Sequence, residues 1–181
     1  MTIIRAEKPA FNLRSKLSEL DYSRVPYQKM PSGSIIQVVD HQDDSHPSKT
    51  GSSYTTISGC TFYVTPKFES SKIFVSWDFG TEQNGVINGL AFKVNRTVNG
   101  TTTKLKEQDQ FSYPTQSGWG NGAGGVNITY VDTPYTTSKI TYYLEWAIEG
   151  GGTFYINYDD GATKDGIQAQ AMEIDNEFEK T

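Results

Sequence analysis

The residues best suited to chemistry in this chain are two histidines and three aspartates in one polar stretch, namely Asp40, His41, Asp43, Asp44 and His46. Carboxylates at near-alternate positions are typical of calcium loops, and paired histidines are typical of transition-metal sites. The stretch lacks the full acidic, glycine-containing pattern of a calcium-binding loop. We therefore interpret it as a solvated surface loop, and we expect no metal and no cofactor.

Catalytic chemistry finds little support in the sequence. Asp132, Asp159 and Asp160 offer carboxylates, but glycoside hydrolysis needs two of them held at a fixed separation across a cleft. Asp159 and Asp160 precede Gly161, a pattern that turn formation explains equally well. The only two histidines lie in one polar stretch, so no Ser–His–acid arrangement can be assigned. We expect a protein that is not an enzyme.

A glycine-rich polar loop over residues 108–125 carries the best candidate for ligand binding. Trp119 lies among glycines there, where its ring has no evident core to enter. Exposed aromatic rings beside amide side chains suit the faces and edges of sugars, or the centre of a protein interface. The alternative, that Trp119 closes the end of its own sandwich or a seam between subunits, stays open. The candidate ligand-binding residues are Tyr113, Gln116, Trp119 and Asn121.

Composition and charge argue against several classes of function. The 181 residues suffice for one domain with an appendage. The net charge of −5 disfavours both sequence-independent nucleic-acid binding and attachment to anionic membranes. The single cysteine, Cys60, rules out an intrachain disulfide, and we expect it to be buried. The sequence shows no transmembrane-length apolar run and no signal-peptide core, so we expect cytoplasmic synthesis and no membrane insertion.

The first part of the chain predicts a short helical arm. Leu13, Leu17 and Leu20 are spaced i, i+4, i+7 and so share one face of a helix, which Asn12 can cap. A helix of about ten residues is marginal alone in water, so this leucine face must dock on its own domain, on symmetry mates or on a partner. Two prolines then predict an extended linker over residues 22–33. The predicted docking residues are Phe11, Leu13, Leu17 and Leu20.

From residue 34 onward the sequence predicts strands and turns. Apolar side chains alternate with others along residues 72–79, and Asn99-Gly100 is a strong hairpin signal. Trp77 and Trp146 fall in apolar strand registers and are assigned to the core. We predict a mainly β fold, a jelly-roll-like antiparallel β-sandwich over residues 34–181, after an arm and linker over residues 1–33. The expected strands span residues 34–39, 54–65 (one strand, or a bulged pair with Gly59 as the bulge), 72–79, 90–98, 101–106, 126–131, 139–148, 153–158 and 166–174, with a polar loop over residues 40–53.

Several short segments resemble structural proteins of tailed bacteriophages, notably phages of cyanobacteria and marine bacteria. Residues 31–39, PSGSIIQVV, are similar to their P-x-G-S-I-I/V-Q-V-V pattern, and residues 64–75 to their T-P-x-x-x-S-S-K-I-L-V segment. The same modules are matched by residues 130–138, and by residues 152–157 together with 171–174. The order and spacing of these segments agree with the family. The polar stretches over residues 40–51 and 108–125 have no counterpart there.

The resemblance implies a virion appendage protein, usually a homotrimer and usually a β-sandwich. We therefore expect a bacteriophage structural protein of the virion, a tail fibre or tail appendage. It would bind other virion proteins through residues 1–33 and a host-surface glycan through loops of its head. Two alternatives stay open: a capsid decoration protein or head fibre that uses the same arm, and a carbohydrate-binding module.

Overall fold

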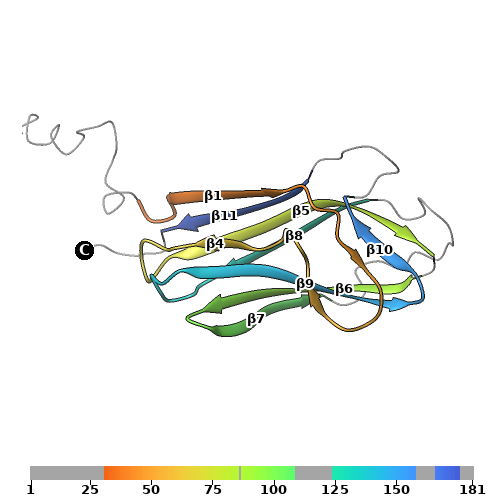
Figure 1. Ribbon diagram of the computed structural model, residues 1–181. Helices are drawn as coiled ribbons and strands as arrows, with labels where there is room; N and C mark the ends of the chain where they lie inside the picture. Colours follow the sequence, from red (N-terminus) through yellow and green to blue (C-terminus); the bar gives the residue numbers. More distant parts are fainter. Residues whose placement is uncertain (1–30, 86, 109–123, 158–165, 176–181) are drawn as a thin grey trace, which may run out of the picture.

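The computed structural model describes residues 31–85, 87–108, 124–157 and 166–175 (Figure 1). Within these ranges the chain forms eleven strands and no helix. The predicted helix of the arm lies outside the described residues. The strands are β1 (Ile35–Asp43), β2 (Ser48–Lys49), β3 (Thr55–Thr56), β4 (Phe62–Val64), β5 (Lys72–Asn84), β6 (Ile87–Val98), β7 (Thr101–Gln108), β8 (Gly124–Asp132), β9 (Ile140–Gly150), β10 (Thr153–Ile156) and β11 (Ile167–Ile174).

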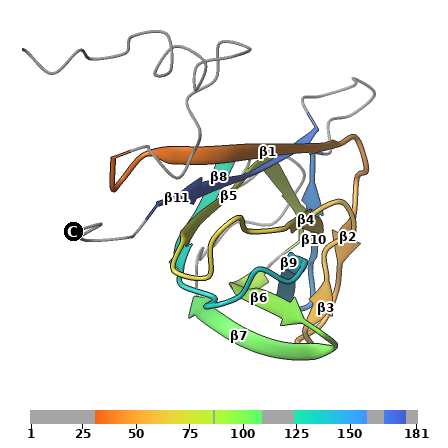
Figure 2. The ribbon, with the colours of Figure 1, turned by 90° about the vertical axis from the view of Figure 1, so that its left-hand side faces the viewer.

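The strands form two antiparallel sheets that face each other (Figures 1 and 2). In sheet A, β5 pairs with β8 along one edge, and with β11 and then β10 along the other. Strands β1 and β2 complete sheet A beside β11 and β10. In sheet B, β9 pairs with both β3 and β4 on one side and with β6 on the other, and β7 follows β6. The predicted mainly β, antiparallel architecture is confirmed.

One hydrophobic core fills the space between the sheets. The predicted strand alternation is confirmed, because inward positions of β5, β6 and β9 are buried. The prediction that Trp77, Trp146 and Cys60 are buried is also confirmed, with exposed fractions of 0%, 2% and 0%. The indole Nε1 of Trp77 donates a hydrogen bond to the carbonyl oxygen of Cys60 at 2.9 Å, so this large ring is buried without an unpaired N–H.

The hairpin between β6 and β7 turns where the sequence indicated. Val98 pairs with Thr101, which leaves Asn99 and Gly100 as a two-residue loop. Their φ angles are 48° and 79°, and both are positive as a type I′ turn requires. Asn and Gly adopt this conformation more readily than other residues do, so the turn follows directly from the residue types.

The structure corrects several boundary predictions. Gln108 ends β7, and Gly124 and Gly125 begin β8, so these residues do not belong to the loop predicted over residues 108–125. Strand β1 continues through Asp43, because residues 40–43 pair with β11, so they are not the surface loop that we expected. Strand β5 runs on to Asn84 because β10 offers it a second partner. Residues 54–65 form two short strands, which is the second of the two predicted alternatives, but Gly59 lies in the turn between them with a φ of +82° rather than in a bulge. A Cβ at Gly59 would lie 2.5 Å from a carboxylate oxygen of Asp43.

A buried carboxylate ties the β4–β5 turn to sheet A. Glu173 of β11 is completely buried. Its Oε1 accepts hydrogen bonds from the backbone N–H of Lys67 at 2.7 Å and of Phe68 at 3.2 Å, and from the hydroxyl of Ser71 at 2.7 Å. Its Oε2 accepts from the side-chain amide of Gln37 at 2.6 Å. A buried charge is tolerated only when it is fully hydrogen-bonded, and these four donors provide that.

Replacing Glu173 tests this connection. We expect Glu173→Ala to lower the free energy of unfolding by about 3 kcal/mol, because the donors of the turn lose a buried, charged acceptor. Gln168→Ala, at an exposed outward position on the same strand, is the matched control and should change stability by less than about 0.5 kcal/mol. Urea unfolding measures both. Equal losses in the two variants would show that the carboxylate does not stabilise the fold.

Candidate functional site

The residues predicted for ligand binding and for docking lie outside the described part of the chain. This holds for the loop residues Tyr113, Gln116, Trp119 and Asn121, and for the arm residues Phe11, Leu13, Leu17 and Leu20. Asp159 and Asp160 are outside it as well. Predictions about these residues therefore stay predictions. The structure does place the polar stretch around His41, and it places Asp132.

The strand β1 separates the side chains that we considered as metal ligands. Asp40 lies on the outer face of sheet A, where it accepts a hydrogen bond from the amide of Gln170 at 2.7 Å. His41 lies on the opposite face of the strand, with its Nε2 3.1 Å from the carbonyl oxygen of Gly59. The side-chain and backbone hydrogen bonds from Ser45 hold the pKa of Asp43 below its ordinary value. Among the described residues, no three His, Cys, Asp or Glu side chains are grouped to hold a metal ion.

Asp132 has a structural role in the interior of the sandwich. It is buried, and both of its oxygens lie 2.8 Å from a guanidinium nitrogen of Arg96. The hydroxyl of Tyr142 donates to it at 2.7 Å. Burial first, and then the charge of Asp132, raises the pKa of Tyr142, which keeps this hydroxyl a donor. A carboxylate that already holds a guanidinium and a phenol is poorly placed to act as an acid, a base or a nucleophile.

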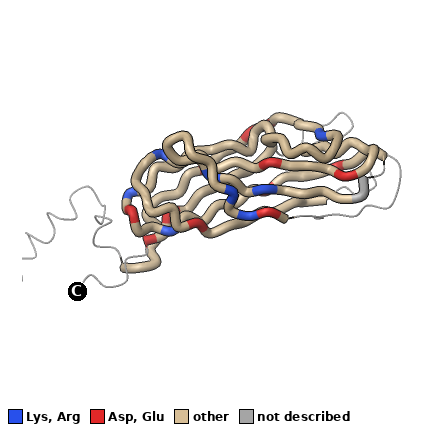
Figure 3. The backbone as a smooth tube through the Cα atoms, turned by 90° about the horizontal axis from the view of Figure 1, so that it is seen from below, with Lys and Arg blue, Asp and Glu red and all other residues tan. Residues whose placement is uncertain are grey.

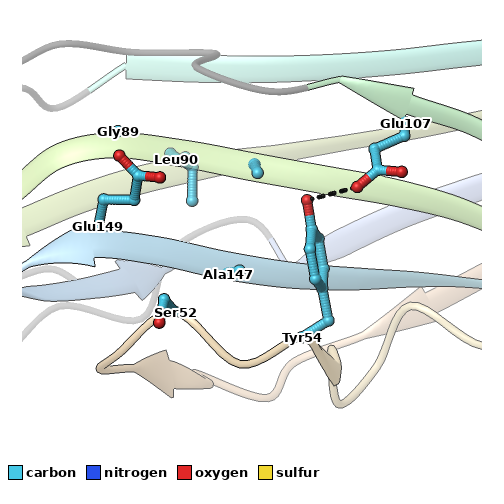
Figure 4. Close-up of a pocket in the computed structure, with 8 residues that line it drawn as sticks. Ser52, Tyr54, Gly89, Leu90, Glu107, Ala147 and Glu149 are labelled. Carbon is cyan, nitrogen blue, oxygen red and sulfur yellow. Dashed lines mark hydrogen bonds between the residues drawn. The ribbon is translucent and has the colours of Figure 1, made fainter.

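A pocket of about 250 Å³ opens on the outer face of sheet B (Figure 4). Its floor consists of small residues on two paired strands, with Gly89 opposite Glu149 and Ala91 opposite Ala147. Small side chains at these outward positions leave the space that larger ones would fill. The pocket is lined by Ser52, Tyr54, Gly89, Leu90, Ala91, Glu107, Ala147 and Glu149.

Tyr54 forms a rigid wall of this pocket. Its hydroxyl donates a hydrogen bond to Glu107 of β7 at 3.0 Å, which carries the side chain across β9 and β6 (Figure 4). The ammonium of Lys93 lies 3.3 Å from the centroid of its ring, as in a cation–π contact. Lys93 belongs to the rung next to the Ala91–Ala147 pair, so this contact is made beside the pocket floor.

Two carboxylates give the pocket its chemistry. Glu107 lies at one end and Glu149 at the other (Figure 4). The pKa of Glu107 lies below its ordinary value, mainly because Lys104 donates a hydrogen bond to its carboxylate. The hydrogen bond from Tyr54 and the nearby charges of Lys104 and Lys93 lower this pKa further. Basic and acidic residues are interspersed along the backbone (Figure 3). A flat aromatic wall with acceptors at both ends suits a small neutral ligand rich in hydroxyl groups.

The sequence contains a weak signal for this pocket. Gly89 and Ala91 alternate with inward-facing apolar residues on β6, and Ala147 does the same on β9. Small residues at outward positions of a strand indicate a site where something else comes close. That they lie opposite each other depends on a pairing between strands more than fifty residues apart, which periodicity does not reveal.

No known protein family matches the chain, and neither does any curated protein. Solved structures match it at low similarity. Dimeric latent PorU from Porphyromonas gingivalis has a TM-score of 0.46 and 10% identity, over 80% of this chain and 14% of that one. Eiger TNF from S. frugiperda has a TM-score of 0.40 and 7% identity, over 80% and 97% of the two chains. The infectious bursal disease virus Gx strain has a TM-score of 0.38 and 12% identity, over 82% and 44%. Likenesses this weak carry no argument about function.

The described residues contain no helix long and apolar enough to cross a membrane.

The pKa of Glu107 provides a test of the pocket wall. We expect its carboxylate to titrate below the ordinary range of glutamate, so that the hydrogen bond from Tyr54 weakens only as the pH falls through that lowered pKa. Lys104→Met should raise this pKa more than Tyr54→Phe does, because Lys104 is the larger cause. Carboxyl ¹³C shifts followed by NMR measure both effects. Lys106→Met, on the same strand, is the control, and an equal effect there would show that general charge sets the pKa.

Proposed function

We propose that this chain is a non-enzymatic structural protein of a tailed-bacteriophage virion, with a jelly-roll head. The strand order carries this proposal. If the eight principal strands β1, β4, β5, β6, β7, β8, β9 and β11 are numbered 1 to 8, sheet A reads 1-8-3-6 and sheet B reads 2-7-4-5. The pairs 1-8, 2-7, 3-6 and 4-5 are those of one long antiparallel ribbon folded over on itself. Jelly rolls of this kind recur in viral capsid domains and lectins.

The placement of the phage-like segments supports the same proposal. Gln37 belongs to the first segment, Lys67 and Ser71 to the second, and Glu173 to the last. All of them meet at the carboxylate of Glu173. Asp132, which binds Arg96, belongs to the remaining long segment. Residues that carry the resemblance are therefore the ones that hold the head together, as expected when proteins share an architecture and differ in their ligands.

The arm over residues 1–33 is proposed to attach the head to the particle. Each attachment by one short helix is weak, and a homotrimer multiplies three such contacts by their effective concentration. A tail fibre or tail appendage is the form that we favour. A capsid decoration protein or head fibre would use the same arm and the same head. The purified protein should have a mass of three times 20.1 kDa in solution.

Removing the arm tests the attachment. We expect a variant that lacks residues 1–28 to fold, because β1 begins at Ile35, yet to be missing from assembled particles. The control is the triple variant Arg14→Ser, Lys16→Ser, Glu19→Ser, which keeps the leucine face and should still be incorporated. Quantitative mass spectrometry of purified particles measures incorporation. Normal incorporation of the truncated protein would contradict an attachment role for the arm.

Glycan binding is a second candidate function, and the pocket beside Tyr54 favours it. The ligand-binding loop is predicted to begin at Gln108, which is the last residue of β7, and Glu107 of that strand lines the pocket. The loop with Trp119 therefore starts at the rim of the pocket. We propose that pocket and loop together bind a neutral sugar of the host surface, since the carboxylates of Glu107 and Glu149 would repel an acidic one.

An adsorption assay tests this second function. We expect Tyr54→Ala and Trp119→Ala each to weaken binding of the head to host cells about tenfold, which corresponds to about 1.4 kcal/mol. Tyr135→Ala, at an exposed tyrosine in the β8–β9 connection, should leave adsorption unchanged. Adsorption that is the same in all three variants would remove the glycan-binding role and leave the structural one.

A further inference from the structure

An apolar band crosses the outer face of sheet A. One rung of paired residues runs across four strands, from Val38 of β1 through Met172 of β11 and Phe74 of β5 to Val131 of β8. Val38 and Val131 are 48% and 51% exposed. Ile35, 52% exposed, and its partner Ile174 extend the band toward the end of the sheet. We refer to these six residues as the apolar band.

The rest of this face is polar, so the band is a local feature. The next rung is Asp40, Gln170, Ser76 and Thr129, and the one after it is Gln42, Gln168, Asp78 and Asn127. These rungs satisfy one another across the strands: Gln170 donates to Asp40 at 2.7 Å, and Asn127 donates to Asp78 at 3.2 Å. Polar rungs of this kind are stable when exposed to solvent. A row of four apolar side chains is not, and exposed apolar patches mark interaction sites.

The arm joins the head at the same end of the sheet. The N–H of Gly33 donates to the carbonyl oxygen of Asp175 at 2.8 Å, and the N–H of Asp175 donates to the carbonyl oxygen of Ser34 at 2.9 Å. These bonds hold the start of the described chain beside the end of β11, next to Ile35 and Ile174. The arm is therefore joined to the head within a few residues of the apolar band.

The dimensions of the arm match the band. Residues 21–30 span up to about 33 Å when extended, which exceeds the width of the four-stranded band, about 14 Å at the usual strand spacing. The leucine face from Leu13 to Leu20 is about 10 Å long in a helix. It is thus long enough to cover most of the rung, and it does not need a larger apolar surface than the band provides. Another copy of the head fits the apolar band less well than the arm does. A stable protein–protein interface buries about 800 Å² on each side and uses about 20 residues or more, whereas the band has six.

We infer that the apolar band is the docking site of the chain's own arm, which lays the face of Leu13, Leu17 and Leu20 across Val38, Met172, Phe74 and Val131. The contact buries a leucine stripe that cannot stay exposed and a row of side chains that the sheet leaves uncovered. It also places the arm against the head before any particle is met. This inference is independent of particle attachment, since the arm can rest on the head whether or not it later binds a virion.

Disulfide trapping in the full-length protein tests the docking. The native Cys60 is fully buried and leaves the introduced thiols as the reactive ones. We expect the pair Leu17→Cys with Val131→Cys to form a disulfide at least tenfold faster than the pair Leu17→Cys with Asn127→Cys. Asn127 lies on the same strand and the same face, among the polar rungs. Non-reducing electrophoresis and peptide mass spectrometry measure the yield of each pair.

A charge in the band provides a second readout. We expect Val131→Asp to speed tryptic cleavage after Arg14 and Lys16 about tenfold, because an aspartate in the band releases the arm, whereas Asn127→Asp should not. Disulfides that form between chains rather than within one would contradict docking of the chain's own arm and would assign the band to the arm of a neighbouring copy. Equal trapping at positions 127 and 131, or equal cleavage in the two aspartate variants, would overturn the inference. So would arm-deleted heads that cross-link to each other through Val131→Cys.

Discussion

The carboxylate of Glu173 is the contact on which the order of this head depends. It lies inside the protein with no cation among the partners described for it, and it accepts hydrogen bonds from four donors in two separate places in the chain. Gln37 comes from the first strand, and Lys67, Phe68 and Ser71 come from the turn that leads into β5. A buried ion leaves little freedom, because each donor that moves away exposes a charge to a medium that solvates it poorly. The first strand, the last strand and the β4–β5 turn are thus fixed to one another.

The residues that resemble phage structural proteins acquire a physical meaning from this arrangement. The segments over residues 31–39, 64–75 and 171–174 meet at the end of the sandwich where the arm enters, whereas residues 152–157 pair with the far end of β5. Two of the segments carry the buried carboxylates, Glu173 and Asp132. Asp132 has the stronger partner in Arg96, and Tyr142 completes its hydrogen bonds. Such polar clusters favour one packing arrangement more than they raise the free energy of unfolding. A misaligned strand would leave the buried charge without its hydrogen-bond donors. This explains how a chain with few recognisable motifs still specifies one sheet order.

The two faces of the sandwich differ in what they leave open. On sheet B, glycine and alanine at facing positions create a pocket that Tyr54 closes on one side. On sheet A, four apolar side chains in register create a band instead of a hollow. The first suits a small polar ligand, and the second suits an apolar segment. The two faces of the sandwich therefore carry the sites that we propose for a ligand and for the arm.

The sequence by itself determined the strands, the hairpin turn at Asn99-Gly100 and most of the core, including Trp77, Trp146 and Cys60. These follow from local rules: side-chain alternation, the positive φ that the turn needs and the burial of apolar residues. The tertiary structure decided the rest. It placed Asp40 and His41 on opposite faces of a strand, brought Glu173 under a turn a hundred residues away, and aligned Ala91 with Ala147 and Val38 with Val131. Each of these depends on which strands pair and in which register. That choice is made by the whole core at once, since a shift of one residue would turn every inward side chain outward.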